Sequence, residues 1–117
     1  MTGKAKIKWV LALGLLVIVA SWLCSPSKPT ARQAAAAADT VQLLQTEGVI
    51  VETSGSTYYI NSAKWYAFSA ETQNMMGRAI SADFQARHGG WVVKLVDAAT
   101  KQRMGYADWS SKGFTEG

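Results

Sequence analysis

Apolar residues are concentrated in one uninterrupted run near the start of the chain. Trp9 to Leu23, WVLALGLLVIVASWL, has 15 residues and no charge. A helix rises about 1.5 Å per residue, so residues 7–24 would span roughly 27 Å. That length suits a thin bilayer. The pattern therefore predicts a transmembrane anchor over residues 9–24, with the lipid bilayer as its first partner.

The residues that flank this run predict how the anchor is placed. Trp9 and Trp22 stand near its two ends, where indole rings favour the membrane interface, and the Lys8 ammonium can reach back to the headgroups. Basic residues before the run slightly outweigh those after it, and they are Lys4, Lys6 and Lys8 against Lys28 and Arg32. This bias favours a cytoplasmic tail at residues 1–8. The chain would then be a single-pass protein of a bacterial inner membrane, and the residues after the anchor would lie in the periplasm.

Two other interpretations of the apolar run stay open. A basic start and an apolar centre are also typical of a cleaved signal peptide, but Ala20 and Ser21 are followed directly by Trp22. Cys24 could carry a lipid, as in bacterial lipoproteins, although Leu23 stands where that signal has a small residue. Cys24 is the single cysteine, so no internal disulfide can form, although a Cys24–Cys24 bridge could join two copies of the chain.

Residues 25–48 form a polar and alanine-rich connection, which we interpret as a partly helical linker. Pro26 and Pro29 favour an extended exit from the membrane. Thr30 can cap a following helix and Gly48 can end it. Four apolar side chains share one helical stripe, and they are Ala34, Ala37, Val41 and Leu44. The stripe is short for a coiled coil, so a spacer helix is favoured over self-association.

Residues 49–117 alternate between strand and helix patterns. The segments 49–53 and 57–61 are rich in β-branched and aromatic residues, and Ser54-Gly55-Ser56 between them predicts a hairpin. Residues 91–96 and 101–109 predict a second pair of strands. Phe114, in the tail, could fold back onto the sheet.

The stretch from Ser69 to His88 predicts the longest helix after the anchor. Ser69 is a good N-cap and Gly89 a good stop. Apolar residues recur every four positions along a core-facing ridge of Met76, Ile80 and Phe84. Asp83 and Arg87 fall inside the wide apolar arc, four residues apart, and are expected to pair with each other.

These elements predict an α+β domain with the order ββαββ. We expect one helix packed on an antiparallel sheet over residues 49–117. A domain this small buries only about 60% of its unfolded surface, so its stability is marginal. A protein partner, or self-association, would compensate for that.

Charge and reactive residues exclude several function classes. From Val49 onward there are seven basic and six acidic residues, interspersed along the chain. Nucleic-acid binding needs a clustered basic face, so we expect none. The only histidine, His88, has no companion for metal binding and sits where a helix dipole stabilises a cation. We therefore expect no enzymatic activity, no metal and no cofactor.

The aromatic content is the stronger indication of a contact surface. Ten aromatic residues lie between Val49 and Gly117, and a helix on one sheet face cannot cover them all. Trp65, Tyr66 and Trp109 lie at or beyond element ends and are the candidates for partner contact. Asp83 and Arg87 are candidates for a polar contact with the same partner.

The sequence as a whole indicates a membrane-anchored accessory subunit without catalytic activity. Its outer domain would dock on a membrane complex or on another copy of itself. The alternative is an envelope binding module that uses exposed aromatic rings to hold a cell-wall sugar or peptide.

Overall fold

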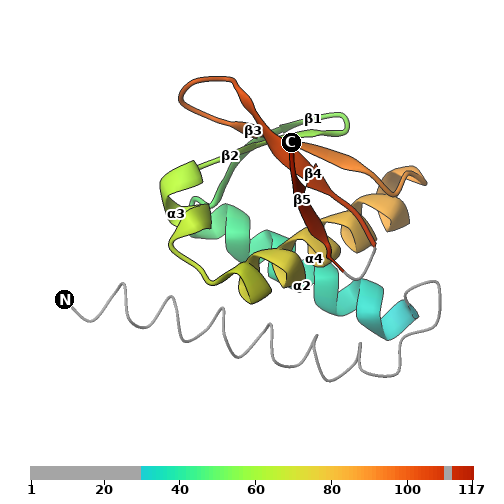
Figure 1. Cartoon of the computed structure of the whole chain (residues 1–117). Helices are drawn as coiled ribbons and strands as arrows, with labels where there is room; N and C mark the ends of the chain where they lie inside the picture. The colour runs from blue at the N-terminus through green and yellow to red at the C-terminus, as the bar shows by residue number, and fades with distance from the viewer. Residues whose placement is uncertain (1–29, 110–111) are drawn as a thin grey trace.

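The computed structural model describes residues 30–109 and 112–117 (Figure 1). These ranges contain helices that cover one face of a mixed sheet, which makes the fold α+β. The helices are α2 (Ala31–Thr46), α3 (Ser62–Tyr66) and α4 (Ala70–His88). The strands are β1 (Ile50–Ser54), β2 (Thr57–Ile60), β3 (Val93–Asp97), β4 (Arg103–Ala107) and β5 (Phe114–Glu116).

The sheet follows chain order, β1-β2-β3-β4-β5, and its centre is parallel. All other neighbouring strands are antiparallel. The expectation of a wholly antiparallel sheet is therefore wrong. The reason is that α4 carries the chain back across the sheet, so β3 enters beside β2 in the same direction. The backbone N–H of Lys94 donates to the Ser56 carbonyl, and that of Ala98 donates to the Ile60 carbonyl, each over 2.8 Å.

The edge strand β1 contains an extra residue. Ile50 pairs with Ile60 and Glu52 pairs with Tyr59, which leaves Val51 without a partner across the strand. Val51 is consequently turned outward and is 57% exposed. This β-bulge bends the edge of the sheet near its beginning.

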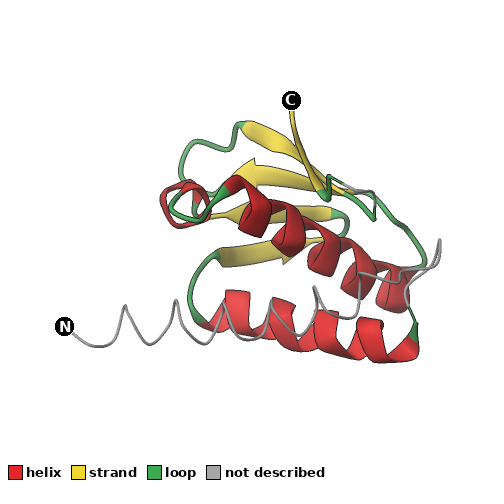
Figure 2. Cartoon of the chain, turned by 60° about the horizontal axis from the view of Figure 1, so that its bottom comes forward, coloured by secondary structure: helices red, strands yellow, loops and turns green. Residues whose placement is uncertain are grey.

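The helical layer consists of α2 and α4, which lie side by side under one face of the sheet (Figure 2). Ala37, Val41 and Leu44 of α2 are almost completely buried. The prediction of a linker at these residues, with a single helix packed on the sheet, is wrong because α2 packs beside α4 as a second helix. The stripe that could have joined two copies is occupied within the chain itself, since small alanine side chains allow α2 to approach α4.

Both long helices begin and end at the predicted signals. The Thr30 hydroxyl accepts from the Gln33 N–H over 3.1 Å, and the Gln33 side chain accepts from the Thr30 N–H over 2.7 Å. This reciprocal pair is a capping box. In α4 the Ser69 hydroxyl accepts from the Thr72 N–H over 3.2 Å. Gly89 ends that helix in the left-handed conformation, with φ of 82°.

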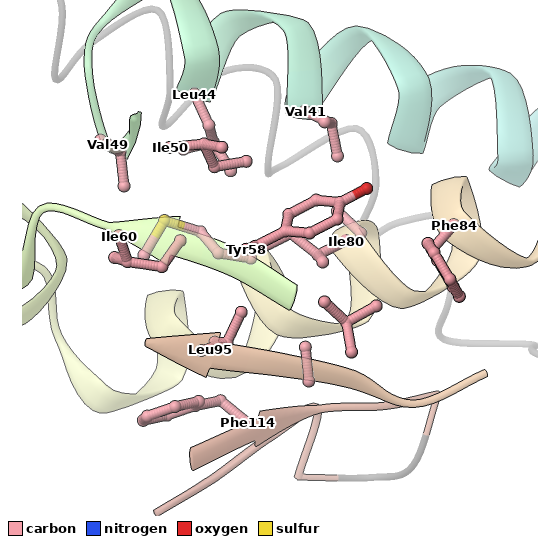
Figure 3. Packing of buried hydrophobic residues seen from close by; sticks show 14 of the residues in the cluster. Val41, Leu44, Val49, Ile50, Tyr58, Ile60, Ile80, Phe84, Leu95 and Phe114 are labelled. Carbon is pink, nitrogen blue, oxygen red and sulfur yellow. The ribbon is translucent and has the colours of Figure 1, made fainter. Parts of the chain in front are cut away.

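The core lies between the two helices and the sheet (Figure 3). The ridge of Met76, Ile80 and Phe84 is buried, as predicted. Tyr58 enters between α2 and α4, and its ring meets Phe84 edge to face at 6.4 Å. The short helix α3 adds Trp65, whose ring lies 5.1 Å from that of Phe114 in β5.

Two glycines allow β5 to lie close to α4. A side chain at Gly77 would collide with the backbone carbonyl of Gly113, and one at Gly113 would collide with the Asn74 carbonyl. Gly113 also has a positive φ of 69°, which glycine adopts without strain. This contact holds the start of β5, and with it Phe114, over the helix.

No helix within residues 30–109 and 112–117 is long and apolar enough to cross a membrane. The predicted anchor, with Lys8, Trp9, Trp22 and Cys24, lies outside the described residues and stays a prediction.

Candidate binding surface

The sheet presents one covered face and one open face. Tyr58, Ile60, Val93 and Leu95 point toward the helices and are buried. Strand alternation sends their neighbours to the opposite face, where no described helix lies (Figures 1 and 2). The strand register aligns the open-face residues in two cross-strand rows. These rows are Glu52, Tyr59, Val96 and Arg103, and Ser54, Thr57, Lys94, Tyr106 and Thr115.

Cations lie over the two tyrosine rings of this open face. The Lys101 Nζ lies 4.6 Å from the centre of the Tyr59 ring, and the Arg103 Cζ lies 5.4 Å from that of Tyr106. Both distances fall within the range of cation–π attraction. Arg103 Nη1 also donates a hydrogen bond to the Tyr106 hydroxyl over 3.0 Å. Each ring of the open face therefore has a cation as its neighbour.

The turn between β3 and β4 positions Lys101. The Asp97 carboxylate accepts from the Thr100 hydroxyl over 2.7 Å and from the Thr100 N–H over 3.0 Å. These bonds, with a further one from the Ser62 hydroxyl, lower the pKa of Asp97 to about 2. Lys101 follows with φ of 64°, the only non-glycine residue with a positive φ in the described ranges. A side chain in that conformation is strained, so the turn holds a lysine at some cost in stability.

Val96 forms an apolar centre in this cationic surface. It belongs to the open face, yet it is only 5% exposed. Its cross-strand neighbours are Tyr59 and Arg103. The face therefore combines a shielded apolar centre, aromatic rings and charges, which is the composition of many protein contact surfaces.

The three aromatic residues predicted to contact a partner differ in their exposure to solvent. Trp65 is completely buried, so the expectation that it is exposed is wrong. Trp109 is half-buried and lies under the Arg78 guanidinium, 4.7 Å from its ring centre. Tyr66 is 45% exposed. Burial and the Glu116 carboxylate, which accepts its hydrogen bond, raise the pKa of Tyr66.

Asp83 and Arg87 form the predicted pair on α4. The Arg87 Nε lies 3.4 Å from the Asp83 Oδ1. Asp83 is only 2% exposed, whereas the Arg87 side chain is 56% exposed, so only the arginine is open to a partner. Burial raises the pKa of Asp83, and the positive charges of Arg87 and His88 oppose that rise.

His88 lies at the last residue of α4, where its ring packs 4.8 Å from that of Phe84. Within the part of the chain that the structure describes, no three His, Cys, Asp or Glu side chains are grouped closely enough to hold a metal ion.

Four residues that define the open face are absent from the predicted contact residues, and they are Tyr59, Lys101, Arg103 and Tyr106. A signal for the tyrosines was present, because Tyr58 and Tyr59 are adjacent in one strand and must point to opposite faces. Knowing which tyrosine faces the helices required the register of the whole sheet. The position of Lys101 depends on the turn conformation, which the local sequence does not specify.

No protein-family model, curated protein or solved structure matches this chain.

Proposed function

We propose that this chain is a membrane-anchored accessory subunit without catalytic activity, which docks on a protein partner through the open face of its sheet. The observation that carries the proposal is the ordered set of rings and cations on that face, built around Tyr59 and Tyr106. Tyrosine and arginine are enriched among the residues that dominate protein interfaces. Their positions are set by the sheet, so binding would cost little additional side-chain order.

The N-terminal sequence supports docking at a membrane surface. The apolar run over residues 9–24 would hold the folded part at the periplasmic surface of a bacterial inner membrane. Only residues 25–29 separate the run from the cap of α2. At about 3.5 Å per residue, such a connector reaches roughly 17 Å, so the partner would itself lie at the membrane surface.

The alternative of a tryptophan platform for envelope sugars has less support. Trp65 is buried in the core, and Arg78 lies over the ring of Trp109.

The proposal is tested by extracting the full chain from its native membranes with a mild detergent and sizing it by gel filtration. Mass spectrometry on the same fractions identifies companion proteins and shows whether Met1 is retained. We expect wild type to elute in a larger particle with defined companions. Replacing both Tyr59 and Tyr106 with serine should release the chain from that particle.

Val92→Ser is the matched control, since Val92 is 54% exposed but precedes β3. This variant should keep the companions. A wild-type chain that elutes alone would contradict the docking proposal. Loss of the first 20 or so residues would show that the apolar run is a signal peptide.

A further inference from the structure

Charge is distributed unevenly over the described part of the chain. Residues 30–109 and 112–117 contain eight basic and eight acidic residues, so their formal net charge is zero. The charge of +4 on the whole chain therefore resides in Lys4, Lys6, Lys8 and Lys28. A neutral domain has no general attraction for anions, so any local excess of one sign is a property of a particular surface.

The open face of the sheet carries such an excess. Lys94, Lys101 and Arg103 lie on it, against the single carboxylate of Glu52. The other described residues include five basic and seven acidic side chains. The open face is thus positive, and the rest of the domain is negative by the same amount.

These three cations are available to a partner. The ion pair of Asp83 with Arg87 lies on α4 and does not involve the open face. Lys94 is directly opposite Tyr106 across the strands, and Arg103 is opposite Val96. Arg103 gives one N–H to the Tyr106 hydroxyl, which leaves other donors of its guanidinium for a carboxylate.

The composition of the face distinguishes a protein from a phosphate polymer. A polyanion is held mainly by the number of phosphates that basic residues neutralise, and the Glu52 carboxylate on the same face would repel it. A protein segment can use the tyrosine rings as well as the charges. A protein segment carries its carboxylates at particular positions, so these can lie away from Glu52.

We propose that the open face binds an acidic segment of a protein partner, with carboxylates of that segment meeting Lys94, Lys101 and Arg103. This inference rests on the proposed function, because it assumes that the open face is the docking surface. It adds the chemistry of the partner, which the proposed function leaves open.

The test places a photoreactive amino acid at Thr115 of the full-length chain in native membranes. Thr115 of β5 is exposed and lies directly across from Tyr106 of β4. Substitution at Thr115 leaves Lys94, Lys101 and Arg103 unchanged. Illumination joins the chain to whatever covers the open face, and mass spectrometry identifies the linked segment. We expect a protein segment with several aspartate or glutamate residues.

Charge reversal then tests the electrostatic contact. Lys101→Glu combined with Arg103→Glu should reduce the cross-linking yield by at least about tenfold, because the reversed charges would repel carboxylates of the partner. Changing acidic residues of the identified segment to lysine should restore the yield. Arg32→Glu, a reversal at an exposed position of α2, should leave the yield unchanged.

Lys101→Gly provides a variant that does not threaten the fold, since glycine suits the positive φ at this position. It removes one cation without adding an anion, so we expect a smaller but measurable loss of yield. An unchanged yield in both this variant and the double reversal would overturn the inference.

Other outcomes separate this inference from the proposed function. A cross-link to a segment without acidic residues, lost on replacing Tyr59 and Tyr106, would support docking and overturn the acidic partner. A cross-link to lipid, to a phosphate polymer or to a second copy would also overturn the acidic partner. No cross-link, in a chain that still co-elutes with companions, would show that docking uses another surface and would overturn both statements about the open face.

Discussion

Asp83 is a residue whose burial works against its charge. Burial disfavours the carboxylate, and Arg87 at 3.4 Å compensates only in part, so the pKa of Asp83 is raised. A raised pKa means that the folded state holds the proton more tightly than the unfolded chain does. The stability from the neutral carboxyl is present in full below the ordinary pKa of 3.8 and is lost as pH rises through the folded-state pKa.

Asp83→Asn should therefore be more stable than wild type at neutral pH. Asparagine resembles the neutral carboxyl in shape and needs no compensating charge. Thermal melts of both proteins from about pH 3 to about pH 7 should show an advantage for the variant that grows with pH. Asp39→Asn, at an exposed position of α2, serves as the control and should show no such trend. A variant that is less stable at neutral pH would mean that the Arg87 pair outweighs burial.

Lys101 illustrates a residue that reduces stability while it supplies a charge. Its φ of 64° is unfavourable for a side chain by about 1–2 kcal/mol, and glycine avoids that strain while losing up to about 1 kcal/mol of chain entropy. We expect Lys101→Gly to stabilise the protein by about 0.5–1 kcal/mol in urea unfolding. Destabilisation would show that the contact of its ammonium with the Tyr59 ring outweighs the strain in the turn.

At the scale of elements, the contact between α4 and β5 reverses the usual effect of alanine. Replacing glycine by alanine inside a helix normally stabilises it by about 1 kcal/mol. At Gly77 the added methyl group would meet the backbone of Gly113, which cannot move aside as a side chain can. Gly77→Ala should instead destabilise the protein by about 1–3 kcal/mol, as measured by urea unfolding. A gain in stability would show that β5 does not depend on this approach.

Elements with strong local signals were predictable from the sequence. Ser69 and Gly89 bound α4, and the hairpin of β1 and β2 closes at Gly55, as expected. These features depend on interactions within a few residues, such as a cap bond or a left-handed turn. The Asp83–Arg87 pair was predictable for the same reason, because helical spacing alone brings the two side chains together.

Features that depend on distant segments were not predictable in this way. The parallel pairing of β2 with β3 is decided by how α4 crosses the sheet, which no local pattern encodes. Trp65 lies in a helix of five residues, too short for periodicity to reveal its buried side. Its ring packs against that of Phe114, which lies 49 positions later in the chain.

At the scale of the whole molecule, α2 determines how much chain is needed to fold. It contributes Ala37, Val41 and Leu44 to the core, and together with α4 it forms the helical layer. Without α2, residues 49–117 would expose Tyr58 and the neighbouring part of the core to water. Burying each large apolar side chain contributes about 1.5–3 kcal/mol, a large share of the stability of a small domain.

A fragment of residues 49–117 should therefore be unfolded or poorly packed, whereas residues 30–117 should fold. Near-ultraviolet circular dichroism distinguishes the two, because Tyr58 and Trp65 give a signal only in fixed surroundings. Adding a peptide of residues 30–48 to the shorter fragment should recover part of that signal. A shorter fragment that melts cooperatively on its own would show that α2 is dispensable.

Val51, the unpaired residue of β1, bears on how readily the protein forms fibrils at high concentration. A regular edge strand offers a template on which other molecules can add strands and grow into fibrils. Val51 breaks that regularity one residue after β1 begins, so a straight incoming strand cannot match the backbone groups on both sides of it. Deleting Val51 would restore an uninterrupted template without turning any other side chain to the wrong face. We expect that deletion to shorten the lag before fibril formation, as followed by thioflavin fluorescence.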